Sequence, residues 1–114
     1  MSLKIVFMGT PEFSVPALEA LIKNKFEILS IYTQPPKKSK RGQKINVSSV
    51  QKFSEKNNLP VRNPENLNNE EEYNFIKNLS ADITIVVAYG KLIPKKFLKT
   101  TKHGFKIGRA SCRE

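Results

Sequence analysis

The sequence predicts an α/β domain with a doubly wound, Rossmann-like and mostly parallel sheet. Apolar, β-branched runs of strand length alternate with segments whose apolar residues recur at helical spacing, the order typical of parallel strands joined by crossover helices. At 114 residues the chain has room for one such domain with a single core. The run Ile83–Ala88 is apolar apart from one threonine and stops at Tyr89-Gly90. This pattern is expected of a central strand that is buried on both faces and ends in a turn.

A strand–helix–strand unit opens the chain. Residues 3–8 form the first predicted strand, and Gly9-Thr10-Pro11 ends it. Thr10 is expected to cap the following helix, with Pro11 at its first position. Residues 27–33 form the second strand, so the three elements predict a right-handed βαβ unit. The apolar face of the helix consists of Phe13, Ala17, Leu18, Leu21 and Ile22.

A long basic loop is predicted for residues 34–46. Pro35-Pro36 excludes a helix at its start, and five cations then fall within eight residues. Like charges at this density repel one another, so we expect the loop to stay mobile until it meets an anion. The five cations are Lys37, Lys38, Lys40, Arg41 and Lys44.

Three further helices and three strands are predicted after the loop. Ser48 or Ser49 is expected to cap a helix that ends near Asn57, and residues 59–61 read as a short edge strand. Asn68 is expected to cap a helix whose first turn, Glu70–Glu72, is acidic, which suits the helix dipole. That helix is expected to bury Tyr73, Phe75, Ile76 and Leu79.

After the central strand, Pro94 opens a short basic helix, and residues 104–106 begin a fifth strand. The predicted strand order is 3-2-1-4-5. In this order the loops after the first and fourth strands line one crevice at the carboxyl edge of the sheet, where open α/β folds bind ligands.

The charge of the chain favours a polyanionic partner. Twenty Lys and Arg against ten Asp and Glu give a net charge of +10, which points first to nucleic acid and second to an acidic membrane surface. A generally lysine-rich surface without a specific partner is the alternative. No run is long enough to span a membrane, no signal peptide is visible and Cys112 is the one cysteine, so we expect a cytoplasmic protein without membrane attachment.

Several common site types are missing from the sequence. The first strand is followed by Gly9 alone rather than by G-x-G-x-x-G, and Tyr32-Thr33-Gln34 offers no acidic residue for a ribose, so dinucleotide binding is not expected. There is no P-loop and no set of metal ligands. His103 is expected to be a solvated residue at a helix end, and Asp82 lies at the wrong end of its strand for the crevice.

Four segments resemble the methionyl-tRNA formyltransferase family, in order and with matching spacing from Leu3 to Lys106. They are Phe7–Phe13, Tyr32–Pro35, the basic loop with Arg41-Gly42, and Val86–Pro94. The resemblance implies an incomplete formyltransferase fold. It also implies transfer of a formyl group from the co-substrate 10-formyltetrahydrofolate to the amino group of initiator methionyl-tRNA, without a metal, by an enzyme that is monomeric at full length.

The resemblance also assigns the site residues. The folate pterin would meet the loop Tyr89, Gly90, Lys91, Leu92 and Ile93. The tRNA would meet Lys37, Lys38, Lys40, Arg41 and Lys44, with Arg41 foremost, through phosphate contacts. The methionyl end of the crevice would be bordered by Gly9, Thr10, Pro11 and Phe13, although an ordinary core position is the alternative for Phe13.

The chain departs from the family pattern after Lys106. The family carries its catalytic Asn-x-His after the fifth strand, then an Asp and a Ser-Leu-Leu-Pro stretch, whereas this chain reads Ile107–Glu114 and stops. One reading frame of a common sequencing adapter translates to these eight residues. We therefore expect residues 1–106 to be the N-terminal part of a formyltransferase domain and 107–114 to be a non-native tail. The chain alone should be inactive and marginally stable, because the catalytic residues are missing and a sheet edge is left unpaired.

Two other functions fit the sequence less well. A formyltransferase of the same fold could act on a nucleotide sugar or on glycinamide ribonucleotide, but a small substrate does not need a loop with five cations. A small non-catalytic RNA-binding domain would bind RNA with steep salt dependence and would have no affinity for folate.

Overall fold

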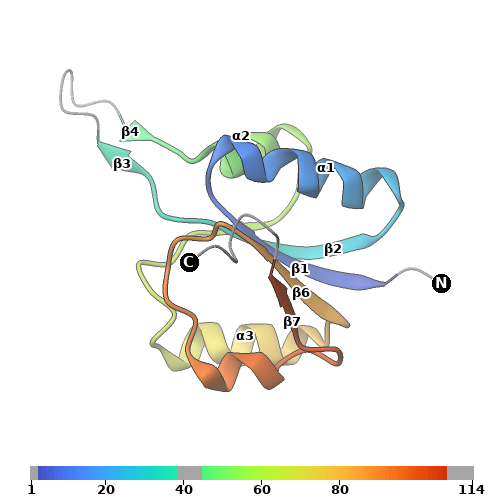
Figure 1. Ribbon diagram of the computed structural model, residues 1–114. Coiled ribbons are helices and arrows are strands. Elements are labelled where there is room, and N and C mark those ends of the chain that lie inside the picture. The colour runs from blue at the N-terminus through green and yellow to red at the C-terminus, as the bar shows by residue number, and fades with distance from the viewer. Residues whose placement is uncertain (1–2, 39–44, 108–114) are drawn as a thin grey trace.

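The computed structural model describes residues 3–38 and 45–107, and within them a five-stranded parallel sheet carries helices on both faces (Figure 1). The strands lie in the order β5-β2-β1-β6-β7. When the five strands of this sheet are numbered along the chain, without β3 and β4, the order is 3-2-1-4-5, as predicted. The α/β fold class and the parallel arrangement are therefore confirmed.

The centre of the sheet is β1 (Lys4–Gly9), between β2 (Glu27–Tyr32) and β6 (Ile83–Val87). The short strands β5 (Val61–Arg62) and β7 (Phe105–Ile107) form the two edges. Because all five strands run parallel, the loops that follow β1, β2 and β6 leave from one edge of the sheet.

Two apolar layers enclose the sheet. On one face, α1 (Val15–Lys23) and α2 (Ser49–Lys56) pack over the strands, and on the other α3 (Glu70–Leu79) and the 3₁₀ helix η2 (Lys95–Lys99) do so (Figure 1). The α1/α2 layer contains Phe7, Leu18, Ile31, Val50 and Val87. The α3/η2 layer contains Val6, Met8, Tyr32, Leu67, Ile76, Ala81, Val86, Tyr89 and Phe97.

β6, which the sequence predicts to be buried on both faces, is buried on both faces at its carboxyl end only. Val86 and Val87 are buried in opposite layers, whereas Ile83 and Ile85 are half-buried. The difference arises because β7 beside them is short and, among the described residues, has no strand on its outer side.

The helix starts differ from the predictions at two caps. Thr10 does not cap a helix: a 3₁₀ turn, η1 (Glu12–Ser14), begins after Pro11 without a side-chain cap, and the Thr10 hydroxyl is hydrogen-bonded elsewhere, as described below. The cap of α3 is Asn69 rather than Asn68, since the Asn69 Oδ1 accepts from the Glu72 amide at 2.7 Å. A cap must directly precede the first helical residue to reach that amide.

The other predicted cap is confirmed and narrowed to one residue. Ser48 caps α2, because its Oγ accepts a hydrogen bond from the Gln51 amide at 3.0 Å.

The basic segment contains more structure than predicted. β3 (Lys37–Lys38) and β4 (Ile45–Asn46) pair antiparallel as a hairpin that stands away from the main sheet (Figure 1). Lys40, Arg41 and Lys44 lie outside the described residues. So do residues 108–114 of the predicted tail, while Ile107 is the last residue of β7. No helix in the described ranges is both long and apolar enough to cross a bilayer.

Candidate ligand crevice

The backbone carbonyl of Tyr89 joins the loops that leave β1, β2 and β6. It accepts hydrogen bonds from the Thr10 hydroxyl at 2.7 Å and from the Gln34 Nε2 at 3.1 Å. The backbone amide of Gln34 in turn donates a hydrogen bond to the Thr10 hydroxyl at 3.3 Å. Three segments that are far apart in the sequence are thereby held at one point of the carboxyl edge, as expected of a ligand crevice at this place in the fold.

The close packing at the end of β1 leaves no room for a side chain at Gly9. A Cβ there would lie 2.9 Å from the Val87 carbonyl oxygen and 2.9 Å from Phe7. The buried Ser14 hydroxyl donates to the same Val87 carbonyl at 2.7 Å. The start of η1 is therefore drawn against the end of β6, which fixes where the two loops face each other.

The loop after β6 owes its shape to left-handed backbone conformations. Ala88 has φ +54° and Gly90 has φ +84°. A Cβ on Gly90 would lie 2.1 Å from Nε2 of Gln34. The side-chain amide of Gln34 therefore lies directly against the Gly90 backbone. Glycine is favoured here by the positive φ, and any side chain at this position would displace the Gln34 side-chain amide.

Tyr89 belongs to the core and not to the crevice surface. Its side chain is 1% exposed and packs in the layer with Phe97. Burial, with a smaller contribution from the charge of Glu72, raises the pKa of Tyr89 to about 12. The phenol hydroxyl has no hydrogen-bond partner in the part of the chain that the structure describes. Tyr89 therefore anchors the loop, and only its backbone lies at the crevice.

The four residues after Tyr89 offer free backbone groups. Within residues 3–38 and 45–107, neither the amides nor the carbonyls of Gly90–Ile93 have a hydrogen-bond partner. The Leu92 side chain is 81% exposed, and Ile93 is packed partly against the core. Unpaired donors and acceptors beside apolar side chains fit a flat heterocycle with a polar edge, which is the chemistry of a pterin.

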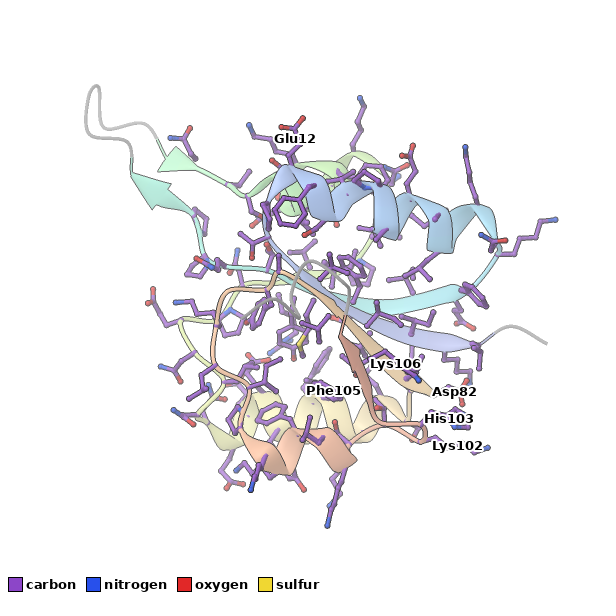
Figure 2. All side chains as sticks on the ribbon, viewed as in Figure 1. Glu12, Asp82, Lys102, His103, Phe105 and Lys106 are labelled. Atoms are coloured by element: carbon purple, nitrogen blue, oxygen red, sulfur yellow. The ribbon has the colours of Figure 1, made fainter. Side chains whose placement is uncertain are left out.

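The residues predicted to border the substrate end lie in the turn between β1 and α1. Gly9 and Thr10 are tied to the end of β6, as described above. Phe13 is 58% exposed, so the alternative of a core position is wrong. Figure 2 shows Glu12 of the same turn on the hairpin side of the molecule and Asp82, Lys102 and His103 together at the opposite end.

The structure explains why Asp82 and His103 do not belong to the crevice. The Asp82 carboxylate accepts from the Lys4 amide at 2.8 Å, and its carbonyl accepts from the His103 amide. Both residues therefore close the amino end of the sheet, as predicted for Asp82. In the described part of the chain, no three His, Cys, Asp or Glu side chains are grouped to bind a metal ion.

The base of the hairpin is fixed to the sheet. Thr33, at the end of β2, and Ser48, the cap of α2, share a hydrogen bond of 2.6 Å between their hydroxyls. This contact closes the segment that begins at Gln34 and carries Lys37 and Lys38 in β3. The base of the hairpin is therefore held next to Gln34, whose side chain contacts the loop after β6.

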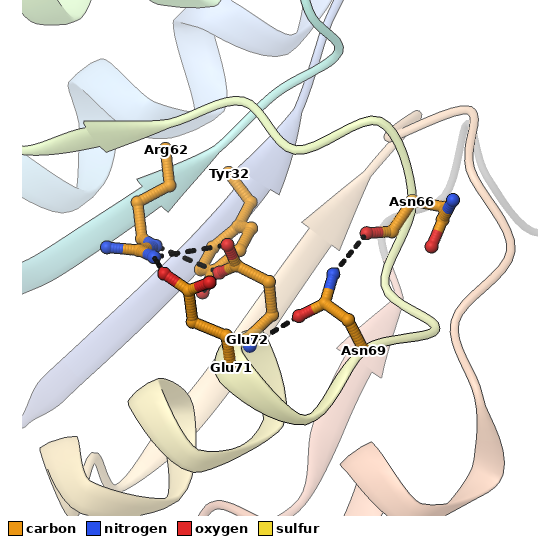
Figure 3. Close-up of polar contacts among 6 residues, drawn as sticks. All are labelled: Tyr32, Arg62, Asn66, Asn69, Glu71 and Glu72. Carbon is orange, nitrogen blue, oxygen red and sulfur yellow. Dashed lines mark hydrogen bonds and ion pairs between the residues drawn. The ribbon is translucent and has the colours of Figure 1, made fainter.

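Sequence reasoning missed a largely buried polar network that links β2, β5 and α3 (Figure 3). Glu72 Oε1 accepts from the Tyr32 hydroxyl at 2.6 Å and from Arg62 Nε at 2.9 Å, and Glu72 Oε2 accepts from the second Arg62 nitrogen at 3.1 Å. The Arg62 guanidinium also lies 4.0 Å from the centre of the Phe75 ring. The acidic first turn of α3 is the one signal in the sequence, and its favourable interaction with the helix dipole does not by itself predict the network.

The network changes the acidity of its members. Burial, the hydrogen bond to Glu72 and its charge raise the pKa of Tyr32 well above the usual range. Burial opposes ionisation of Glu72, but hydrogen bonds from Arg62 and Tyr32 outweigh it and lower the pKa. The hydrogen bond to Glu72 also raises the pKa of Arg62. The partly buried ion pair between Arg62 and Glu72, with the hydrogen bond from Tyr32, thus ties α3 and β5 to β2.

Comparison with known proteins decides the family. The sequence profile of the family described as formyl transferase matches residues 3–107. The chain belongs to the formyl transferase family. Within this family it resembles proteins named methionyl-tRNA formyltransferase.

Three such relatives illustrate the similarity. The protein of Pelagibacter ubique is 53% identical over 106 residues, which cover 92% of this chain and 34% of the relative. That of Alkaliphilus oremlandii is 47% identical over 90% of this chain and 33% of its own length. That of Chelativorans sp. is 47% identical over 97% of this chain and 36% of its own length. The chain thus spans about a third of the length of these formyl transferase relatives.

Proposed function

We propose that this chain is the folate-side part of an enzyme that transfers a formyl group from 10-formyltetrahydrofolate to the amino group of initiator methionyl-tRNA. The observation that carries the proposal is the loop Gly90–Ile93, whose backbone groups are unpaired among the described residues, at the crevice edge of a formyl transferase fold. The names of the relatives support methionyl-tRNA as acceptor.

Different residues at the carboxyl edge of the sheet would bind the folate, position the loop and contact the methionyl group. Amides and carbonyls of Gly90–Ile93 would bind the pterin edge, with Leu92 against its face. The carbonyl of Tyr89, held by Thr10 and Gln34, would keep that loop in place before the ligand arrives. Phe13, which is exposed in the turn after β1, would contact the methionyl side chain.

The acceptor would be recognised by charge. Lys37, Lys38, Lys40, Arg41 and Lys44 would contact tRNA phosphates, which predicts steeply salt-dependent binding. A formyltransferase for a nucleotide sugar or for glycinamide ribonucleotide has no need of these cations.

The chain itself would not catalyse the reaction. Formyl transfer requires a donor that polarises the formyl carbonyl and a group that takes the proton from the amine. We propose that these groups, an Asn, a His and an Asp, belong to the two-thirds of the relatives' length that this chain does not span.

The proposal is tested with a full-length chimera in which residues 3–107 replace the matching third of the Pelagibacter ubique relative. Calorimetric titration with 5-formyltetrahydrofolate, a stable analogue of the donor, should give saturable binding. The substitution Gly90→Val should abolish it, whereas Gly104→Val, at a second positive-φ glycine far from the crevice, should leave it in place. Equal binding by all three proteins would refute the assignment of the loop.

A further inference from the structure

A groove lies between α3 and η2, on the face of the sheet opposite the hairpin. It has a volume of about 430 Å³ and is lined by Tyr73, Lys95, Lys96, Leu98 and Lys99. We call it the basic groove. Its size falls within the roughly 300–1,000 Å³ typical of ligand sites.

Two of the three lysines that line the basic groove have no neighbouring carboxylate. Glu72 is paired with Arg62, and Glu70 reaches Lys96 at 3.6 Å. Lys95 and Lys99 have no carboxylate partner among the described residues. The groove therefore presents uncompensated positive charge, which is complementary to a polyanion.

The lining also includes an aromatic and an aliphatic surface. The Tyr73 ring packs edge-on against Phe97, with 5.7 Å between ring centres. The Lys96 ammonium lies 4.7 Å from the centre of the Tyr73 ring. Leu98 is 44% exposed. Cations beside an aromatic ring are the combination by which proteins follow a single nucleic-acid strand, since phosphates meet the charges and sugars or bases meet the apolar atoms.

The basic groove adjoins the crevice. η2 follows Ile93 after a single residue, Pro94, so Lys95 begins where the proposed folate loop ends. The hairpin leaves the same edge of the sheet after β2, toward the other face (Figure 1). A nucleic acid that places one end in the crevice can therefore contact the hairpin on one side and the groove on the other.

We propose that the basic groove is a second RNA-binding surface, which contacts the sugar–phosphate backbone of a strand through Lys95 and Lys99. The proposal goes beyond the function proposed above and rests on it only in the choice of RNA as the polyanion. The groove adds to the hairpin and does not replace it.

The test is the salt dependence of RNA binding by the 114-residue chain, measured by fluorescence anisotropy with a labelled RNA stem-loop that has a single-stranded 3′ end. The double variant Lys95→Gln/Lys99→Gln removes two phosphate contacts. Because each contact contributes about 0.7–0.9 to the slope of log K against log salt, the affinity lost between about 50 and 200 mM KCl should be about tenfold smaller than in the unmodified chain. The control Lys4→Gln/Lys23→Gln removes the same charge from exposed residues at the amino end of the sheet and should leave the slope unchanged.

A second pair of variants tests the groove without removing lysines. Leu98→Glu places a negative charge among the phosphates and should weaken binding more than the neutral Leu98→Gln, which removes the apolar contact alone. Far-ultraviolet circular dichroism checks that each variant is folded.

The outcomes separate the groove from the proposed function. If a hairpin variant, Lys37→Gln/Lys38→Gln, loses affinity while the groove variants match their controls, the groove proposal is overturned and RNA recognition by the hairpin stands. If the unmodified chain binds anionic vesicles but not RNA, the groove proposal and the proposed recognition of tRNA by the hairpin are both overturned, whereas folate binding by the loop Gly90–Ile93 is tested separately with the chimera.

Discussion

Replacement of Gly90 by alanine should destabilise the protein through a specific side chain, Gln34. A non-glycine residue at φ +84° is strained by about 1–3 kcal/mol. The new Cβ would also lie 2.1 Å from the Gln34 Nε2. The flexible Gln34 side chain can move away, but it then loses its hydrogen bond to the Tyr89 carbonyl, worth about 0.5–1.5 kcal/mol.

Gly104 provides a matched control for the strain. It has φ +76°, but the nearest atom to a Cβ there is the Leu98 carbonyl oxygen at an ordinary 3.8 Å. Gly104→Ala should therefore show the backbone strain alone. Gly90→Ala should exceed it by about 1 kcal/mol, which corresponds to about 4–8 °C in the midpoint of thermal unfolding for a domain of nearly this size.

A double-mutant cycle identifies the source of the difference. Gln34→Ala alone should cost about 1 kcal/mol, and in its presence Gly90→Ala should cost no more than Gly104→Ala, because the obstructing amide is gone. The assay is urea unfolding followed by circular dichroism. Equal effects of Gly90→Ala and Gly104→Ala, with additive behaviour in the cycle, would refute the contact between Gln34 and Gly90.

Three further predictions follow from buried polar groups and caps. Hydrogen bonds lower the pKa of Glu72 in the folded protein, so ionised Glu72 stabilises the fold. This contribution is fully present above the ordinary carboxyl pKa of about 4.3, and it is lost as the pH falls through the lower pKa of the folded state. Glu72→Gln should therefore reduce the fall in the free energy of unfolding between neutral and acidic pH, and an unchanged pH profile would contradict this. Tyr89→Phe removes a buried hydroxyl without a partner among the described residues, so it should be neutral or stabilising by up to about 1 kcal/mol, and a loss of that size on thermal unfolding would reveal a hidden partner. Asn69→Ala should cost about 0.5–2 kcal/mol and Asn68→Ala close to nothing, and the reverse order would restore the cap expected from the sequence.

The strand order could be predicted because the signals are local. The β-branched run from Ile83 and the pattern of strand, helix and strand at the amino end depend on residues close in sequence. Parallel topology follows from the length of the crossovers and their fixed hand. The position of Gly9 and Tyr89-Gly90 at one crevice then follows from the topology.

The details that could not be predicted depend on contacts across the sheet. Thr10 could cap a helix by its type, but the carbonyl of Tyr89, 79 positions away, takes its hydroxyl instead. Tyr32, Arg62 and Glu72 form one network only after β2, β5 and α3 are assembled. The orientation of the Tyr89 ring likewise depends on both faces of the sheet, so its burial in the core was not visible in the loop sequence.

We propose that the loop Gly90–Ile93 serves formyl transfer to methionyl-tRNA, and the rate of that transfer by the full-length chimera should be measured first. With 10-formyltetrahydrofolate as donor, the chimera should formylate methionyl-tRNA and should leave glycinamide ribonucleotide and nucleotide sugars unmodified. A folded chimera that binds folate but formylates a small nucleotide in preference to methionyl-tRNA would contradict the account.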